Sequence, residues 1–141
     1  MKVLRNAFRV LVILWAGSLW SLALWVLPTL FYAQSDRHLA GLLAARFFSI
    51  ETYVGLLVAG LAMALDCGTR FRWGYFAAGL LVLNEWGLKP LMNLAQAHGS
   101  AAGLGFGAWH GLAAIVYLLA CGAVLRLVWL QPVDIQFAEN G

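Results

Sequence analysis

The sequence predicts an all-α integral membrane protein, a bundle of four membrane-spanning helices in one domain covering residues 1–141. Of the 141 residues, 63% are hydrophobic and only 11% are charged, and the mean hydropathy is +0.83. This composition excludes an ordinary soluble domain and a disordered chain. The apolar residues lie in four long runs that do not alternate with polar residues, so helices are predicted rather than barrel strands.

Each run is long enough to cross a hydrocarbon core of about 30 Å, which takes about 20 helical residues. We predict helices over about residues 10–32, 47–65, 74–94 and 106–130. The first run contains no charged residue, whereas the third contains Glu85 and Lys89. The third helix is therefore the most polar of the four.

Basic residues in the short flanking segments predict the orientation, because Lys and Arg concentrate on the cytoplasmic side. Two lie on the predicted outer side, Arg37 and Arg46. Six lie at the opposite ends of the helices: Lys2, Arg5, Arg9, Arg70, Arg72 and Arg126. We expect a multi-pass protein of the inner (plasma) membrane with both termini in the cytoplasm.

Two short patterns occur in both halves of the chain. Residues 25–30 read WVLPTL and residues 86–91 read WGLKPL. Phe47 precedes Glu51 by four positions, as Phe106 precedes His110. One interpretation is a repeat of two parallel helical hairpins related by an axis along the membrane normal; the other is chance similarity between apolar segments. The repeat predicts that Glu51 and His110 lie at equal depth and face each other.

Each pattern contains a proline, Pro28 or Pro90. We expect these prolines to end their helices near the membrane interface, and the alternative is a kink within a continuing helix.

The candidate site is a polar cluster in the outer leaflet. Glu85 and Lys89 are four residues apart and share a helix face, which allows them to pair. Asn84 and Arg46 border the same region, and Glu51 and His110 complete the six residues of the predicted site. An unpaired charge at helix-centre depth costs roughly 2.5–3.5 kcal/mol. The pair either only makes the third helix insertable, or it lines an outward-facing cavity.

His110 is the weak candidate for a metal ligand; otherwise it relays a proton or forms a hydrogen bond to Glu51 or Asn84. Zinc and copper sites gather His and Cys ligands at short spacings, and no HxxH, HxxxH or CxxC pattern occurs here. No cofactor is expected.

The motifs resemble those of the transmembrane-protein-205-like family, whose bacterial members form domain of unknown function 4149. The resemblance rests on short motifs in order: Gly17-Ser18, Pro28 to Phe31, Ala40-Gly41, Arg46-Phe47-Phe48 with Glu51 and Tyr53, Asn84 to Pro90 with Met92, and Phe106 to Gly111. It implies a small four-helix membrane protein and supplies no reaction. The family is distantly similar to copper-resistance D-like membrane proteins and to small haem-binding oxidases, but the first predicted helix contains no histidine.

Three functions are compatible with these observations. The leading one is a non-enzymatic accessory or assembly subunit, or an oligomeric carrier, with its polar site in the outer leaflet. The alternatives are a metal- or haem-linked redox protein and a proton- or ion-coupled transporter. Expected partners are the lipid bilayer and, through helix faces, further copies of this chain or other membrane subunits. Nucleic acid is not expected, because no basic patch with interleaved aromatic residues occurs.

Overall fold

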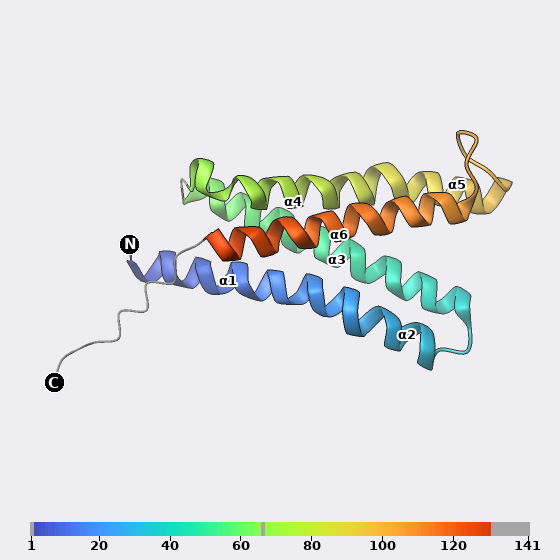
Figure 1. The fold of residues 1–141 in the computed structure, drawn as a ribbon, viewed down its shortest axis with the longest axis horizontal. Coiled ribbons are helices and arrows are strands. Elements are labelled where there is room, and N and C mark those ends of the chain that lie inside the picture. The colour runs from blue at the N-terminus through green and yellow to red at the C-terminus, as the bar shows by residue number, and fades with distance from the viewer. Residues whose placement is uncertain (1, 66, 131–141) are drawn as a thin grey trace.

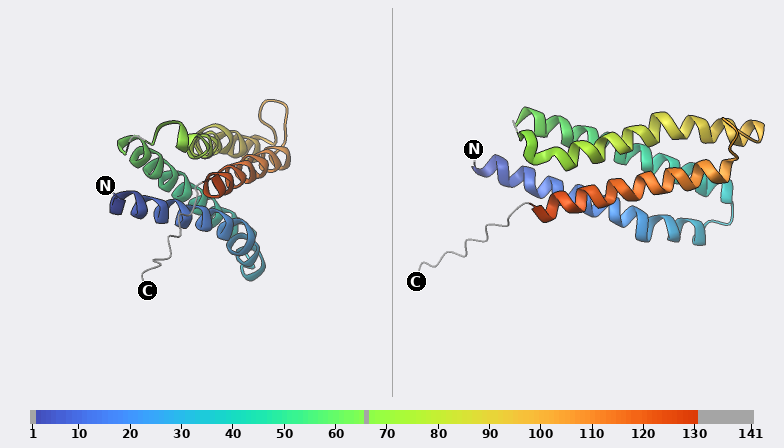
Figure 2. Two further views of the ribbon diagram at one scale, coloured as in Figure 1. Left: turned by 60° about the vertical axis from the view of Figure 1, so that its left-hand side comes forward. Right: turned by 45° about the horizontal axis from the view of Figure 1, so that its top comes forward.

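The structure, a computed structural model, describes residues 2–65 and 67–130. They form a bundle of four helical rods lying side by side (Figures 1 and 2), which confirms the predicted all-α class. The first rod contains α1 (Lys2–Ser21), the π-helical turn η1 (Leu22–Val26) and α2 (Leu27–Ala33). The second rod is α3 (Arg37–Ala64). The third, after the 3-10 turn η2 (Gly68–Phe71), contains α4 (Arg72–Val82), the π-helical turn η3 (Leu83–Leu88) and α5 (Lys89–His98), and the fourth is α6 (Phe106–Leu130).

The rods alternate in direction, so the connections lie at two opposite ends of the bundle (Figure 1). We call the end that carries the α2–α3 and α5–α6 connections, residues 34–36 and 99–105, the loop end. The start of α1, the α3–α4 connection and the last turn of α6 lie at the other end, the terminal end.

Three helical segments are long and apolar enough to cross a membrane: Val3–Ala33, His38–Ala64 and Phe106–Leu130. Large apolar side chains cover much of the outer surface of the bundle, among them Leu57, Phe76 and Leu118. A protein surface this apolar is suited to lipid rather than to water. The chain is therefore an integral membrane protein. The third rod falls outside the three segments, because its second half contains several polar residues.

The second helix begins at Arg37, ten residues before the predicted start at residue 47. Asp36 caps it: its Oδ1 accepts hydrogen bonds from the backbone N–H groups of His38 (2.9 Å) and Leu39 (3.2 Å). An aspartate at this position satisfies N–H groups that have no partner within the helix. The sequence prediction missed this start because it followed hydropathy, and residues 37–46 include three basic or titratable side chains.

Neither proline ends its helix, so the expectation that they mark the interface is wrong. In each case a π-helical turn precedes the proline, and an α-helix continues beyond it to Ala33 or His98. The residue before each proline donates its backbone N–H to the carbonyl five residues earlier: Leu27 to Leu22, and Lys89 to Asn84. The wider turn accommodates a residue that cannot donate. The two hairpins therefore share one backbone feature at the same place.

The main core lies between α1, α3, α4 and α6. Gly55 on α3 permits the closest approach, since a Cβ atom there would lie 3.0 Å from the Trp15 ring and 3.1 Å from Leu81. Tyr117 of α6 donates its hydroxyl proton to the carbonyl of Leu19 on α1 at 3.0 Å. Small residues and inter-helix hydrogen bonds are typical of helix packing in membranes, where burial of apolar area supplies little drive.

Candidate functional site

A cavity of about 700 Å³ lies between the four rods in the half of the bundle nearer the loop end. Along α3 it extends from His38 to Thr52, which is roughly 21 Å at 1.5 Å per residue. The first and fourth rods separate toward the loop end (Figures 1 and 2), and this divergence leaves the space. The cavity therefore reaches from one end of the bundle to about its middle.

Most of the cavity wall is apolar. The first rod contributes Ala23, Leu27, Pro28 and Phe31. At the inner end the rings of Phe48 and Tyr117 meet edge to face, with their centroids 4.8 Å apart. Polar side chains line the rest: His38, Thr52, Asn84, Glu85, Lys89, Asn93, Gln96, His110 and Tyr117. The site is thus an apolar pocket with a set of polar side chains on the second, third and fourth rods, here called the polar stripe.

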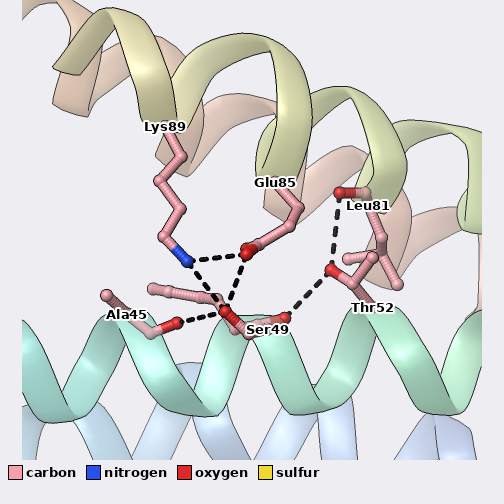
Figure 3. Close-up of polar contacts among 7 residues, drawn as sticks. Ala45, Ser49, Thr52, Leu81, Glu85 and Lys89 are labelled. Carbon is pink, nitrogen blue, oxygen red and sulfur yellow. Dashed lines mark hydrogen bonds and ion pairs between the residues drawn. The ribbon is translucent and has the colours of Figure 1, made fainter. Parts of the chain in front are cut away.

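Three side chains of α3, η3 and α5 form a network within this stripe (Figure 3). Lys89 Nζ donates to Glu85 Oε1 at 2.6 Å and to Ser49 Oγ at 2.8 Å. Ser49 Oγ also lies 2.8 Å from Glu85 Oε1 and 3.0 Å from the carbonyl of Ala45. The Glu85–Lys89 pair that the sequence predicts is present, and Ser49 joins it to the second rod.

Deeper in the cavity, hydrogen bonds from side chains to backbone carbonyls connect the rods. Thr52 Oγ1 donates to Phe48 of its own helix at 3.0 Å and lies 3.4 Å from the Leu81 carbonyl (Figure 3). Asn84 Nδ2 donates to the Ala113 carbonyl of α6 at 3.4 Å. His110 is exposed and stacks on Phe106, with ring centroids 5.8 Å apart. Asn84 therefore stabilises helix packing, whereas the His110 ring stays open to the cavity.

Two of the six predicted site residues lie elsewhere. Arg46 is exposed on α3, away from the cavity. Glu51 is buried and does not line the cavity; its Oε2 lies 3.2 Å from Ser18 Oγ of α1.

The prediction that Glu51 and His110 face each other at equal depth is wrong. Glu51 is fourteen residues into α3 and His110 four residues into α6. Both helices start at the loop end, so the two residues differ in depth by roughly 15 Å. The error follows from the predicted start of the second helix, which placed Glu51 one turn from its end.

Sequence reasoning did not include His38, Ser49, Thr52 and Gln96 in the site. His38 lies in the part of α3 that the prediction placed outside the helix. Recognising Asp36 as an N-cap would have placed His38 in the helix. Gln96 continues the stripe of Glu85, Lys89 and Asn93 at helical spacing. Ser49 and Thr52 carry no distinctive pattern, and only packing brings them to this face.

The cavity offers few ligands for a metal. Among residues 2–65 and 67–130, no group of three or more His, Cys, Asp or Glu side chains could hold a metal ion. The polar stripe instead offers amide, ammonium, carboxylate and imidazole groups, which act as hydrogen-bond donors and acceptors.

The first three rods resemble a known protein family. The family model described as domain of unknown function DUF4149 matches residues 10–101. This range contains most of the first rod and all of the second and third, including every cavity residue that precedes α6. No curated protein and no solved structure matches the chain. Because the family match covers more than half of the chain, the protein belongs to the DUF4149 family.

Proposed function

We propose that this protein is a non-enzymatic membrane protein that binds a small amphiphilic molecule in the cavity, as a carrier or as an accessory subunit. The observation that carries the proposal is the cavity itself, about 700 Å³ and lined by residues of all four rods. Its volume lies within the usual range for small-molecule sites, about 300–1,000 Å³.

The chemistry of the lining selects the ligand class. An apolar wall some 20 Å long fits a hydrocarbon or isoprenoid portion. Lys89, Asn93 and Gln96 supply donors, and Glu85 and the amide oxygens supply acceptors. A polar head group with both donors and acceptors would bind along this stripe, with the apolar portion extending toward Phe48 and Tyr117.

The proposal also states how the four rods and the two ends of the bundle lie in the membrane. The third rod crosses beside the other three, because it packs on α6 through α4, η3 and α5 and on α3 through α4 and η3, and its Glu85 and Lys89 form an ion pair. The loop end faces outward and both termini face the cytoplasm of a cell bounded by this inner membrane, since basic residues concentrate at the terminal end. Exposed apolar helix faces would contact lipid, further copies of the chain or other membrane subunits.

A matched pair of glycines on α3 tests ligand binding. Gly41 lines the cavity and Gly60 does not, and an added Cβ at either would meet nothing within 4 Å. Gly41→Trp should fill part of the cavity and reduce at least tenfold the amphiphile that co-purifies in mild detergent, measured by mass spectrometry of extracts. Gly60→Trp should retain it. Equal retention in both variants, or no amphiphile bound to the wild type after reconstitution in native lipid, would contradict the proposal.

One observation favours a second candidate, proton- or ion-coupled transport. The cavity places a Glu85–Lys89–Ser49 network halfway along a membrane-spanning bundle, and ionisable groups at such depth often lie on ion pathways. The redox alternative has no comparable support, because the described residues include no cluster of metal ligands.

We also propose that this protein is related to transmembrane-protein-205-like proteins and, more distantly, to copper-resistance D-like membrane proteins. The motifs from Gly17 to Met92 fall within the matched region, whereas Phe106 to Gly111 lie beyond it.

A further inference from the structure

Glu51 is a buried carboxyl group outside the cavity. It lies on α3 with 8% of its surface exposed, and its hydrogen-bond partner is Ser18 of α1. Of the cationic side chains that the structure describes, none forms an ion pair with it. Burying a charged carboxylate without a cation is very costly, so the protonation state of this group matters.

The contacts of the Ser18 hydroxyl indicate whether Glu51 is protonated. Ser18 Oγ lies 2.8 Å from the carbonyl oxygen of Trp15 and 3.2 Å from Glu51 Oε2. A carbonyl oxygen can only accept, and a serine hydroxyl has a single proton to donate. If that proton goes to Trp15, the nearer oxygen, then the proton between Ser18 and Glu51 must come from Glu51.

We propose that Glu51 is a proton-binding site, a neutral carboxylic acid that donates to Ser18 Oγ while Ser18 donates to the Trp15 carbonyl. The chain of two hydrogen bonds satisfies every group in it. The ionised alternative would turn the Ser18 proton toward Glu51, release the Trp15 carbonyl and leave a buried negative charge with one neutral donor.

The groups around Glu51 agree with this assignment. Tyr117 and Cys121 of α6 are titratable side chains close enough to interact electrostatically with Glu51, and neither carries a positive charge. The Tyr117 hydroxyl donates to Leu19, so its proton is already engaged. On the third rod, Lys89 is held by Glu85 and Ser49. None of the cationic side chains that the structure describes is therefore positioned to stabilise an ionised Glu51.

The proton site lies just beyond the inner end of the cavity. Thr52, the next residue after Glu51, lines the cavity, and so does Tyr117. Phe48 also lines the cavity, and its ring meets that of Tyr117 edge to face, with the centroids 4.8 Å apart. The proposal includes a route for water from the cavity to Glu51, past this contact. This inference goes beyond the proposed binding of an amphiphile and does not depend on what occupies the cavity.

Infrared spectroscopy of the full chain in lipid bilayers at neutral pH tests the protonation state directly. The chain contains three glutamates, Glu51, Glu85 and Glu139, and labelling with ¹³C-carboxyl glutamate assigns their bands. The expected result is a protonated-carboxyl C=O band that shifts with the label, is absent in Glu51→Gln and persists in Glu85→Gln. The amide that Glu51→Gln introduces is isosteric with the acid and can still donate to Ser18.

Should Glu51→Gln fail to fold, Ser18→Ala supplies the assignment, because loss of the acceptor should move the band to higher frequency. No label-sensitive band in the wild type would show that Glu51 is ionised and overturn the proposal. A band that remains in Glu51→Gln, or that does not move in Ser18→Ala, would also overturn it.

Exchange of the carboxyl proton for deuterium tests the route. Phe48→Ala should accelerate the deuterium shift of the Glu51 band at least severalfold, because it removes one ring of the Phe48–Tyr117 contact and so widens the proposed route. Phe47→Ala is the matched control: the same residue type one position earlier on α3, exposed and outside the cavity. Equal exchange rates in the two variants would rule out access through the cavity.

Discussion

Lys89 Nζ lies 2.6 Å from Glu85 Oε1 across the junction between η3 and α5, and both side chains line the cavity. The side chain of Glu85 is 12% exposed and that of Lys89 is 29% exposed. The two residues therefore form the ion pair that their spacing predicts, and they line a cavity. The two charges neutralise each other within the third rod, and they also form the most polar part of the cavity wall.

A double-mutant cycle measures how strongly these two residues interact. Glu85→Gln should destabilise the protein, because it leaves the Lys89 ammonium without its charged partner; partial exposure limits the loss to about 1–3 kcal/mol. Glu85→Gln combined with Lys89→Met should recover most of that loss. The measurement is the free energy of unfolding in detergent. A double variant less stable than the sum of the single changes would contradict simple pairing.

Gly55 should tolerate no larger side chain. A Cβ atom there already meets Trp15 at 3.0 Å and Leu81 at 3.1 Å, so Gly55→Leu should force α1 and α4 away from α3 and cost about 1–3 kcal/mol. Gly60→Leu on the same helix is the control, since its added Cβ meets nothing within 4 Å. Thermal unfolding of both variants checks the difference, and equal midpoints would show that the close approach at Gly55 is not required.

Trp109 should hold the loop between α5 and α6. Its Nε1 donates to the carbonyl of buried Ala101 at 3.0 Å. Trp109→Phe leaves that carbonyl without its donor, at a cost of about 1–3 kcal/mol. Amide hydrogen exchange across residues 99–105 should then become faster. Trp25→Phe, at a site that is 72% exposed, should leave exchange in this loop unchanged, and an equal effect of both changes would refute the role of the hydrogen bond.

The orientation can be tested with single cysteines at the two ends of the bundle. Arg70→Cys and Ser100→Cys each introduce an exposed thiol, at the terminal end and the loop end respectively. In a background of Cys67→Ser and Cys121→Ala, a membrane-impermeant maleimide should label position 100 from outside intact cells and position 70 only after lysis. Labelling of position 70 in intact cells would reverse the proposed topology.

Much of the fold was predictable because apolar runs of helical length have few alternatives in a membrane. The boundaries of the fourth helix, residues 106–130, agree with α6. Hydropathy was a poor guide to where the second helix begins, since an N-cap and not an apolar residue starts it. The prediction that the prolines end their helices was wrong for a related reason. A π-helical turn depends on backbone hydrogen bonds, and no residue pattern in the sequence indicates them.

By itself the sequence determined the helical class, three apolar segments long enough to cross a membrane and the Glu85–Lys89 pair, because these depend on composition and on spacing within one helix. Tertiary structure decided which polar groups meet. Ser49 joins Glu85 and Lys89, Ser18 contacts Glu51, and His110 lies far from Glu51. The physical reason is that contacts between rods depend on the register and rotation of each helix. A start displaced by ten residues changes the depth of every side chain that follows.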